Sequence, residues 1–243
     1  MKTIQLASLV TGLLMSAFSS EAQTNSFLTN GLIAYYPFNG NANDQSGNSN
    51  NGTVYGATLT TNRFGVSATA YEFNGTNNYI SANVSNLPTG SSARTATLWA
   101  KPNLLAPVRG AALLFWGTNQ NTEAFEVLNI STPYQWEGGG WGGGNSVNTG
   151  VHVDSNWHFI VQTYDGAGMS MWIDGTNYGT ALIPINTPLS RLIIGAQDPS
   201  FALDTYFAGA ISEVRIYNRV LSSNEVSQLY QYESTPGRAS FFL

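Results

Sequence analysis

Two glutamates and two histidines are the side chains whose chemistry could support catalysis. Glu123 and Glu126 lie three residues apart in a segment with the composition of a strand. A retaining glycosidase needs its two carboxyl groups about 5 Å apart, whereas residues three apart on a strand point to opposite faces. The spacing therefore predicts turn or strand-edge roles for both glutamates, and the sequence predicts no catalytic residue.

The two histidines, His152 and His158, lie close to Asp154 in the sequence. An acyl-transfer triad also needs a serine on a strained elbow, and the sequence contains no Gly-x-Ser-x-Gly motif. His158 follows Trp157 and is expected to pack or to hydrogen-bond locally at the start of a strand. His152 is the better candidate for a function.

Aromatic residues around a glycine run could instead bind a carbohydrate. Trp136 and Trp141 flank or interrupt the glycine-rich stretch 137–144, which is expected to be a mobile loop because glycine in a strand costs conformational entropy. The apolar face of a pyranose packs on an exposed ring, while nearby amides, such as those of Asn129, Asn145 and Asn148, bind its hydroxyl groups. In the alternative interpretation the loop folds over a sheet edge and the rings only shield it. The predicted ligand-binding residues are Tyr134, Trp136, Trp141 and Asn145.

The other tryptophans are expected to serve the core. Trp99, Trp157 and Trp172 alternate with apolar residues inside predicted strands, which is typical of side chains that point into a sandwich. Trp116 lies at a strand end, so its exposure is left open.

The composition excludes several classes of function. Charged residues make up 9% of the chain, the formal net charge is −5, and the basic residues are scattered. Nucleic-acid binding needs a basic surface that neutralises phosphates, so no nucleic-acid partner is expected. The chain has no cysteine, which excludes thiol chemistry and zinc–thiolate sites. Asn, Gly, Ser and Thr dominate the polar positions, and such a surface suits neutral sugars.

The N-terminus has the features of an export signal. Lys2 precedes a largely apolar segment, and small residues at Ser20 and Ala22 predict a signal peptide over 1–22, cleaved after Ala22. No later stretch approaches the roughly 20 apolar residues of a membrane-spanning helix. The mature protein is therefore expected to be secreted or at the cell surface, without a membrane span and with no cysteine cross-links.

Short segments rich in β-branched and aromatic residues recur between turn dipeptides such as Asn74-Gly75 and Asp165-Gly166. This spacing predicts antiparallel strands in a two-layer sandwich rather than βαβ units. The expected strands are 32–38, 70–74, 78–83, 94–101, 111–117, 123–130, 157–164, 168–174, 177–183, 190–196 and 206–218.

One helix is expected after the last strand. Ser222 or Ser223 can cap it, Glu225 falls in its first turn, and apolar residues follow at helical spacing. We expect a lead over 23–30, one domain over 31–233, and a linker-like or disordered tail over 234–243.

An ordered set of motifs resembles one family. The motifs, all read from the sequence, are Gly31-Leu32-Ile33-Ala34-Tyr35-Tyr36-Pro37-Phe38, Asp44-Gln45-Ser46-Gly47-Asn48, Tyr71-Glu72-Phe73-Asn74-Gly75, Trp172-Ile173-Asp174-Gly175, and the run from Phe207 to Leu221. Together they resemble the bacterial LamG-like jelly-roll type of the concanavalin A-like lectin/glucanase superfamily. The resemblance implies an all-β, two-sheet antiparallel jelly roll and a binding or adhesive role, but it implies no reaction. Glucanase relatives carry acidic residues at i, i+2 and i+4, and this chain has no such run.

A structural calcium ion is a further expectation that the resemblance raises. Asp44 lies in an Asn-, Gly- and Ser-rich turn that could offer oxygen ligands, although an Asx turn needs no metal. Family members commonly use an acidic residue immediately before the glutamate that stands here as Glu213, but this chain has Ser212 there. Asp44 and Glu213 are therefore the remaining candidate calcium ligands, and no cofactor is expected to be required.

These observations leave three hypotheses open. The first is a secreted, non-catalytic module that binds a polysaccharide or glycoconjugate through loops on the rim of the sandwich. The second is a structural or protein-interaction domain, which would contact a surface protein. The third is a divergent polysaccharide hydrolase or lyase, in which Glu126 would be the residue to test.

Overall fold

The computed structural model describes residues 28–104, 111–130, 134–140, 146–200 and 205–237. The chain divides into the units Met1–Gly31 and Leu32–Leu243, and the β-sandwich belongs to the second. The predicted signal peptide and the candidate ligand residues Trp141 and Asn145 lie outside the described residues.

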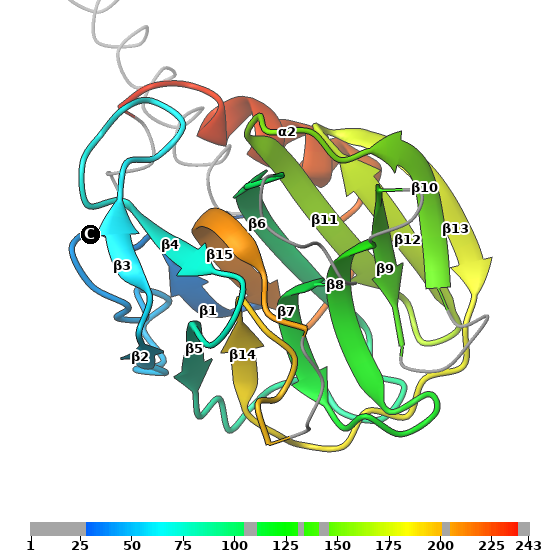
Figure 1. The fold of residues 1–243 in the computed structure, drawn as a ribbon. Coiled ribbons are helices and arrows are strands. Elements are labelled where there is room, and N and C mark those ends of the chain that lie inside the picture. Colours follow the sequence, from blue (N-terminus) through cyan, green and yellow to red (C-terminus); the bar gives the residue numbers. More distant parts are fainter. Residues whose placement is uncertain (1–27, 105–110, 131–133, 141–145, 201–204, 238–243) are drawn as a thin grey trace, which may run out of the picture. The chain divides into compact units, whose positions relative to one another are not determined.

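Two antiparallel sheets form the jelly roll that the sequence predicts (Figure 1). Sheet A has eight strands in the order β13-β12-β11-β6-β15-β4-β3, with β1 paired to β15. Their bounds are β1 (Leu32–Tyr36), β3 (Thr58–Thr60), β4 (Ala70–Asn74), β6 (Arg94–Pro102), β11 (His158–Tyr164), β12 (Gly168–Ile173), β13 (Thr176–Leu182) and β15 (Ala208–Tyr217).

Sheet B has seven strands in the order β10-β9-β8-β7-β14-β5-β2. Their bounds are β2 (Gly52–Tyr55), β5 (Tyr79–Ala82), β7 (Ala111–Gly117), β8 (Ala124–Ile130), β9 (Gln135–Gly139), β10 (Ser146–His152) and β14 (Leu192–Ile194). The eleven strands expected from the sequence are confirmed to within a few residues, whereas β2, β3, β9 and β10 are additional.

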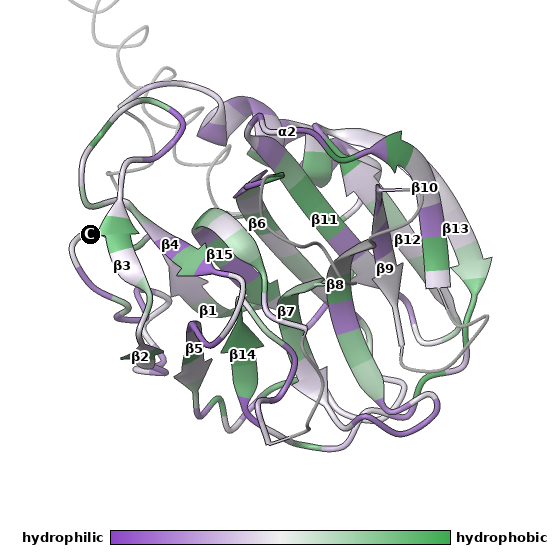
Figure 2. Cartoon of the chain, in the orientation of Figure 1, coloured by the Kyte–Doolittle hydropathy of each residue, from purple (hydrophilic) through white to green (hydrophobic). Residues whose placement is uncertain are grey.

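The core lies between the sheets and is built from alternate residues of each strand. Along β4, Tyr71 and Phe73 belong to it, and along β6 Leu98 and Ala100 do. Since successive side chains of a strand point to opposite faces, the residues between them face outward. Figure 2 shows hydrophobic and hydrophilic residues mixed along strands such as β8 and β11, as this two-sided arrangement requires.

Strand β9 corrects the prediction of a mobile loop for residues 137–139, whereas positions 141–144 of that stretch lie outside the described residues. Its glycines pair with β8 on one side and β10 on the other, so their backbone groups are bonded within the sheet. A Cβ atom on Gly138 would lie 2.3 Å from Sδ of Met171 and 2.6 Å from Oε1 of Gln162, both in sheet A. Glycine is used here because the sheets approach each other closely, and this offsets its entropic cost.

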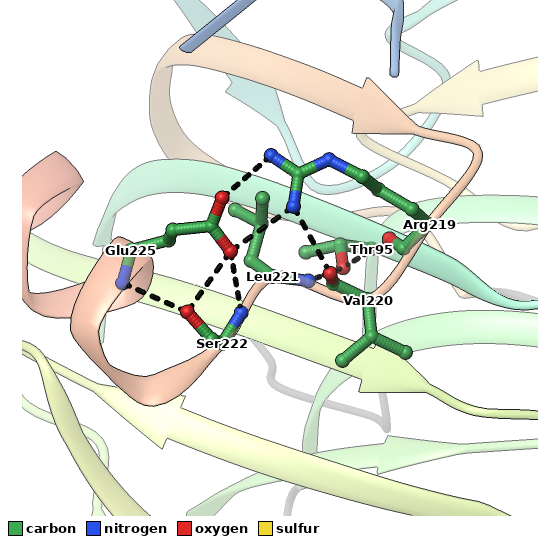
Figure 3. A network of polar contacts seen from close by, with 6 residues as sticks. All are labelled: Thr95, Arg219, Val220, Leu221, Ser222 and Glu225. Carbon is green, nitrogen blue, oxygen red and sulfur yellow. Dashed lines mark hydrogen bonds and ion pairs between the residues drawn. The ribbon is translucent and has the colours of Figure 1, made fainter. Parts of the chain in front are cut away.

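Helix α2 (Ser223–Glu233) begins with the capping box that the sequence predicts. The side chain of Ser222 accepts from the backbone N–H of Glu225, and the Glu225 carboxylate accepts from the backbone N–H of Ser222 at 2.8 Å. Figure 3 shows how Arg219 also pairs with Glu225, at 2.8 Å, while Thr95 of β6 bonds the backbone on either side of Val220. The start of the helix is thereby attached to sheet A.

The end of α2 is attached to the outer face of sheet A by a buried ion pair. Arg215 of β15 donates from Nε to Oε1 of Glu233 at 2.8 Å, and Trp99 of β6 donates from Nε1 to Oε2 at 2.7 Å. The ring of Tyr230 stacks on Trp99 with 5.9 Å between the centroids. Trp99 is therefore buried as predicted, but under the helix rather than between the sheets.

Candidate binding pocket on sheet A

A pocket of about 630 Å³ opens on the outer face of sheet A. Its floor is a row across three neighbouring strands, in which Glu72 of β4 pairs with Ala210 of β15, and Ala210 pairs with Lys101 of β6. Since the backbones of adjacent strands lie about 4.8 Å apart, the Cα atoms of Glu72 and Lys101 lie roughly 10 Å apart. The small side chain of Ala210 leaves the space between them open.

The turn from β10 to β11 forms one wall of the pocket. Ser155 and Trp157 line it, and Trp157 is only partly exposed. His158, the next residue, pairs with Ala100 of β6, and both Trp157 and Lys101, the residues that adjoin this pair in the sequence, line the pocket. The prediction that Trp157 packs in the core between the sheets is wrong, because this residue precedes the strand and its ring lines the pocket instead.

Arg63 forms the opposite side and is held rigidly. Its guanidinium lies over the rings of Trp99 and Phe64, with 4.2 Å and 4.6 Å to the centroids. Its Nε donates to the backbone carbonyl of Glu233 at 3.1 Å, and Nη2 bonds the same oxygen. At this side the pocket therefore adjoins the buried contacts among Trp99, Arg215 and Glu233 that hold the end of α2.

The charges of the pocket are mixed. Arg63 and Lys101 supply two cationic groups, and Glu72 supplies a carboxylate. Burial raises the pKa of Glu72, and the ammonium group of Lys101 opposes that rise. Together with the amide of Asn103, which also lines the pocket, these groups offer both donors and acceptors beside an aromatic ring.

The predicted role of Trp136 is wrong. Trp136 lies in β9 with its side chain completely buried in the core between the sheets, because alternation along the strand turns positions 136 and 138 inward. Its ring packs edge-on against His158 at 5.9 Å between centroids. Tyr134, in the turn before β9, is 50% exposed and can still contact a ligand.

Asp44 adopts the Asx-turn alternative. Its Oδ1 accepts from the backbone N–H groups of Tyr35 and Ser46, and its Oδ2 accepts from the Ser46 hydroxyl and the Asn50 N–H, each at 2.9 Å. A cation would have to displace these donors. Within the described residues no group of three or more His, Asp or Glu side chains could hold a metal ion.

The second candidate calcium ligand, Glu213, is buried beneath the helix network. Its Oε2 accepts from the Tyr35 hydroxyl at 2.7 Å and lies 3.8 Å from Nη2 of Arg215. Calcium binding by Asp44 and Glu213 stays a prediction.

Glu123 and Glu126, the two glutamates considered as a possible catalytic pair, occupy different environments. Glu123 accepts from Thr118 within the β7–β8 turn at 2.5 Å, which agrees with its predicted turn role. Glu126 was expected at a turn or strand edge, but only 3% of it is exposed on the outer face of sheet B. There it accepts from Nε2 of Gln197 at 2.6 Å.

Replacing Glu126 by Gln should remove a pH-dependent loss of stability. Burial, opposed by the Gln197 hydrogen bond, raises the pKa of Glu126 from 4.5 to about 7. The folded state therefore holds a proton that the unfolded state has lost, and stability falls as pH rises between these values, by about 3 kcal/mol in total. Urea unfolding should show Glu126→Gln more stable than the wild type by about that amount at pH ~8 and equal to it at pH ~4.5. An unchanged pH slope in Glu126→Gln, with Glu123→Gln as the control, would contradict this.

The sequence reasoning missed the residues of the pocket. Glu72 lies between two core residues in the Tyr71-Glu72-Phe73 motif, and Lys101 follows Trp99 at the same alternation, so both could have been assigned to the outer face. Their alignment across β4, β15 and β6 depends on strand register, and β15 contains an irregularity between Ser212 and Arg215. A single sequence does not carry that register.

The chain belongs to the concanavalin A-like lectin/glucanases superfamily, whose sequence profile matches residues 74–227. A search of curated proteins by sequence gives no match.

Solved structures share the fold. Domain 4 of AbnA, an extracellular arabinanase from Geobacillus stearothermophilus solved in complex with arabinotriose, is 19% identical with a TM-score of 0.64; the match covers 82% of this chain and 98% of that one. The binding domain of Paraclostridial Mosquitocidal Protein 1 is 17% identical with a TM-score of 0.66, over 84% of this chain and 52% of that one. A Trypanosoma rangeli sialidase is also 17% identical, with a TM-score of 0.64, over 84% of this chain and 33% of that one. The chain thus spans about half of the toxin domain and a third of the sialidase, and the fold occurs in both binding domains and an enzyme.

Proposed function

We propose that this protein is a secreted binding module that takes an oligosaccharide into the pocket on sheet A. The observation that carries the proposal is the pocket itself, in which Trp157 stands beside a charged row with Ala210 at its centre. A sugar ring can lay its apolar face on the indole while its hydroxyl groups bond Glu72, Lys101 and Asn103. Such a site needs neither a metal ion nor a catalytic carboxylate pair.

The fold comparisons support a binding role by analogy. A domain of the same fold was solved with arabinotriose, and another is described as a toxin's binding domain. Secretion agrees with the signal peptide that the sequence predicts, and no helix of the described residues is long and apolar enough to cross a membrane. Arabinotriose is therefore a reasonable first probe, within a wider glycan array.

Trp157→Ala should weaken oligosaccharide binding roughly tenfold or more, because the ring supplies the apolar contact. A glycan array first identifies the polysaccharides that the protein binds. Affinity electrophoresis in gels that contain these polysaccharides, followed by calorimetry with oligosaccharides, then measures the affinity. Tyr134→Ala is the matched control: it removes a half-exposed aromatic side chain outside the pocket and should leave binding unchanged.

Two results would count against the pocket. Binding lost in Tyr134→Ala but retained in Trp157→Ala would move the site to the β8–β9 rim. Failure to bind any glycan, with capture of a surface protein that is insensitive to Trp157→Ala, would favour the protein-interaction hypothesis.

A further inference from the structure

His158 bridges two carboxylates at the end of the turn that supplies the pocket residues Ser155 and Trp157. Its Nδ1 lies 2.8 Å from Oδ2 of Asp174, and its Nε2 lies 3.0 Å from Oδ1 of Asp154. An ionised carboxylate only accepts hydrogen bonds, so both ring nitrogens must donate, and only the protonated imidazole can do so. The geometry therefore describes an imidazolium held between two acceptors.

The bridge fixes the turn that forms the pocket wall. Asp154 also accepts from the backbone N–H of Asn156 at 2.7 Å and from its side-chain amide at 3.0 Å. Ser155 and Trp157, which line the pocket, lie within this short turn between Asp154 and His158. Their positions therefore depend on the contact between Asp154 and His158.

The two carboxylates are not held equally. Asp174 accepts from the backbone N–H of Phe159 at 2.8 Å, and its own N–H donates to the carbonyl of Phe159 at 2.8 Å. Asp154 belongs to an exposed turn, and half of its side chain is accessible to solvent. When the imidazole is neutral it has one N–H, and the contact with Asp154 is the one that gives way.

We propose that His158 is a positioning residue whose proton sets the pocket wall: the imidazolium holds Ser155 and Trp157 in the ligand-binding arrangement, and loss of the proton releases them. The inference rests on the proposed function for its consequence, since the affinity for an oligosaccharide then falls as the pH rises. The expected decrease is roughly tenfold, the factor that one charge-assisted hydrogen bond supplies.

The direction of the pH response follows from the neighbours of His158. The hydrogen bond to Asp174 raises the pKa of His158 above 6.5, burial opposes the rise, and Asp154 adds to it. The ring of Trp136, which carries no charge, packs against the imidazole. The proton is therefore lost at a higher pH than from an ordinary histidine, and the wall loosens as the pH rises through the pKa of His158.

The first experiment uses nuclear magnetic resonance on the protein without ligand. The indole resonance of Trp157 should shift between pH ~6 and ~9 with the same midpoint as the His158 ring, and this transition should vanish in His158→Gln. His152→Gln is the matched control, since it removes the other histidine, which lies in β10 of sheet B, and it should keep the transition. A Trp157 resonance that ignores the titration of His158, or a transition that survives in His158→Gln, would overturn the proposal.

The second experiment measures calorimetric binding of arabinotriose at the same pH values. Wild-type affinity should fall roughly tenfold from pH ~6 to ~9, whereas His158→Gln should bind at the weak level throughout. Asp154→Asn should also bind weakly at pH ~6, because a neutral amide holds the imidazolium less strongly. Glu126 and Glu213 still titrate in the His158→Gln variant. A wild-type pH profile of binding in that variant would therefore assign the pH response to groups other than His158 and would overturn the proposal. If arabinotriose does not bind at any pH while the resonance transition is present, the choice of ligand fails and the proton-dependent wall stands.

Discussion

Glu233→Ala should lower the free energy of unfolding by about 3–5 kcal/mol, the usual cost of removing one partner of a buried ion pair. The carboxylate accepts from Arg215 at 2.8 Å and from Trp99 at 2.7 Å, and it is completely buried at the end of α2. Its loss leaves the Arg215 guanidinium, itself 1% exposed, with the carboxylate of Glu213 at 3.8 Å from Nη2. Urea denaturation monitored by fluorescence gives the measurement, because Trp99 lies in the network.

The start of the same helix offers the matched control. Glu225→Ala removes the capping box and a partly exposed ion pair with Arg219, so it should cost only about 1 kcal/mol. Equal costs for Glu225→Ala and Glu233→Ala would contradict the account of how the helix is attached. If Glu233→Ala does not fold, Glu233→Gln, which keeps an acceptor for Trp99, should give an intermediate loss.

Trp136→Ala should destabilise the domain by about 3–5 kcal/mol, because it empties a large volume in a close-packed core. The side chain is fully buried between β9 and sheet A, where it also packs against His158. Thermal unfolding measures the effect as a lower Tm. Any loss of ligand binding in this variant should follow the loss of folded protein.

Tyr134→Ala, two residues away in the sequence, is the surface control for the burial of Trp136. This half-exposed residue should change stability by less than about 0.5 kcal/mol. A folded Trp136→Ala protein with wild-type stability and lost glycan binding would support the rim site that the sequence suggested and contradict the buried position.

The strands that the sequence predicted are those in which both the β-branched and aromatic composition and the alternation of apolar and polar residues indicate a strand. Tyr71-Glu72-Phe73 has aromatic residues on the core side and a charged residue between them, and it forms β4 as expected. Strand β9 was missed because its glycines carry no hydrophobic signal, and their role depends on Met171 and Gln162 in the other sheet. Strand formation at such a position is decided by tertiary packing rather than by local preference.

The pocket was missed for a related reason. Its parts come from β4, β6, β15, the segment 60–63 at the end of β3 and the turn before β11, most of which are far apart in the sequence. Alternation places Glu72 and Lys101 outward, but only the pairing of both strands with Ala210 brings them into one row. Gly209 permits that pairing, since a Cβ there would lie 2.3 Å from the backbone oxygen of Lys101. The histidine between two aspartates likewise joins residues from two turns.

A crystal structure of the protein with an oligosaccharide that it binds on the glycan array tests the central claim most directly. The account predicts one sugar ring against the indole of Trp157, with hydroxyl groups bonded to Glu72 and Lys101. Sugar density on the outer face of sheet B, or beside Tyr134 with the pocket on sheet A empty, would contradict it.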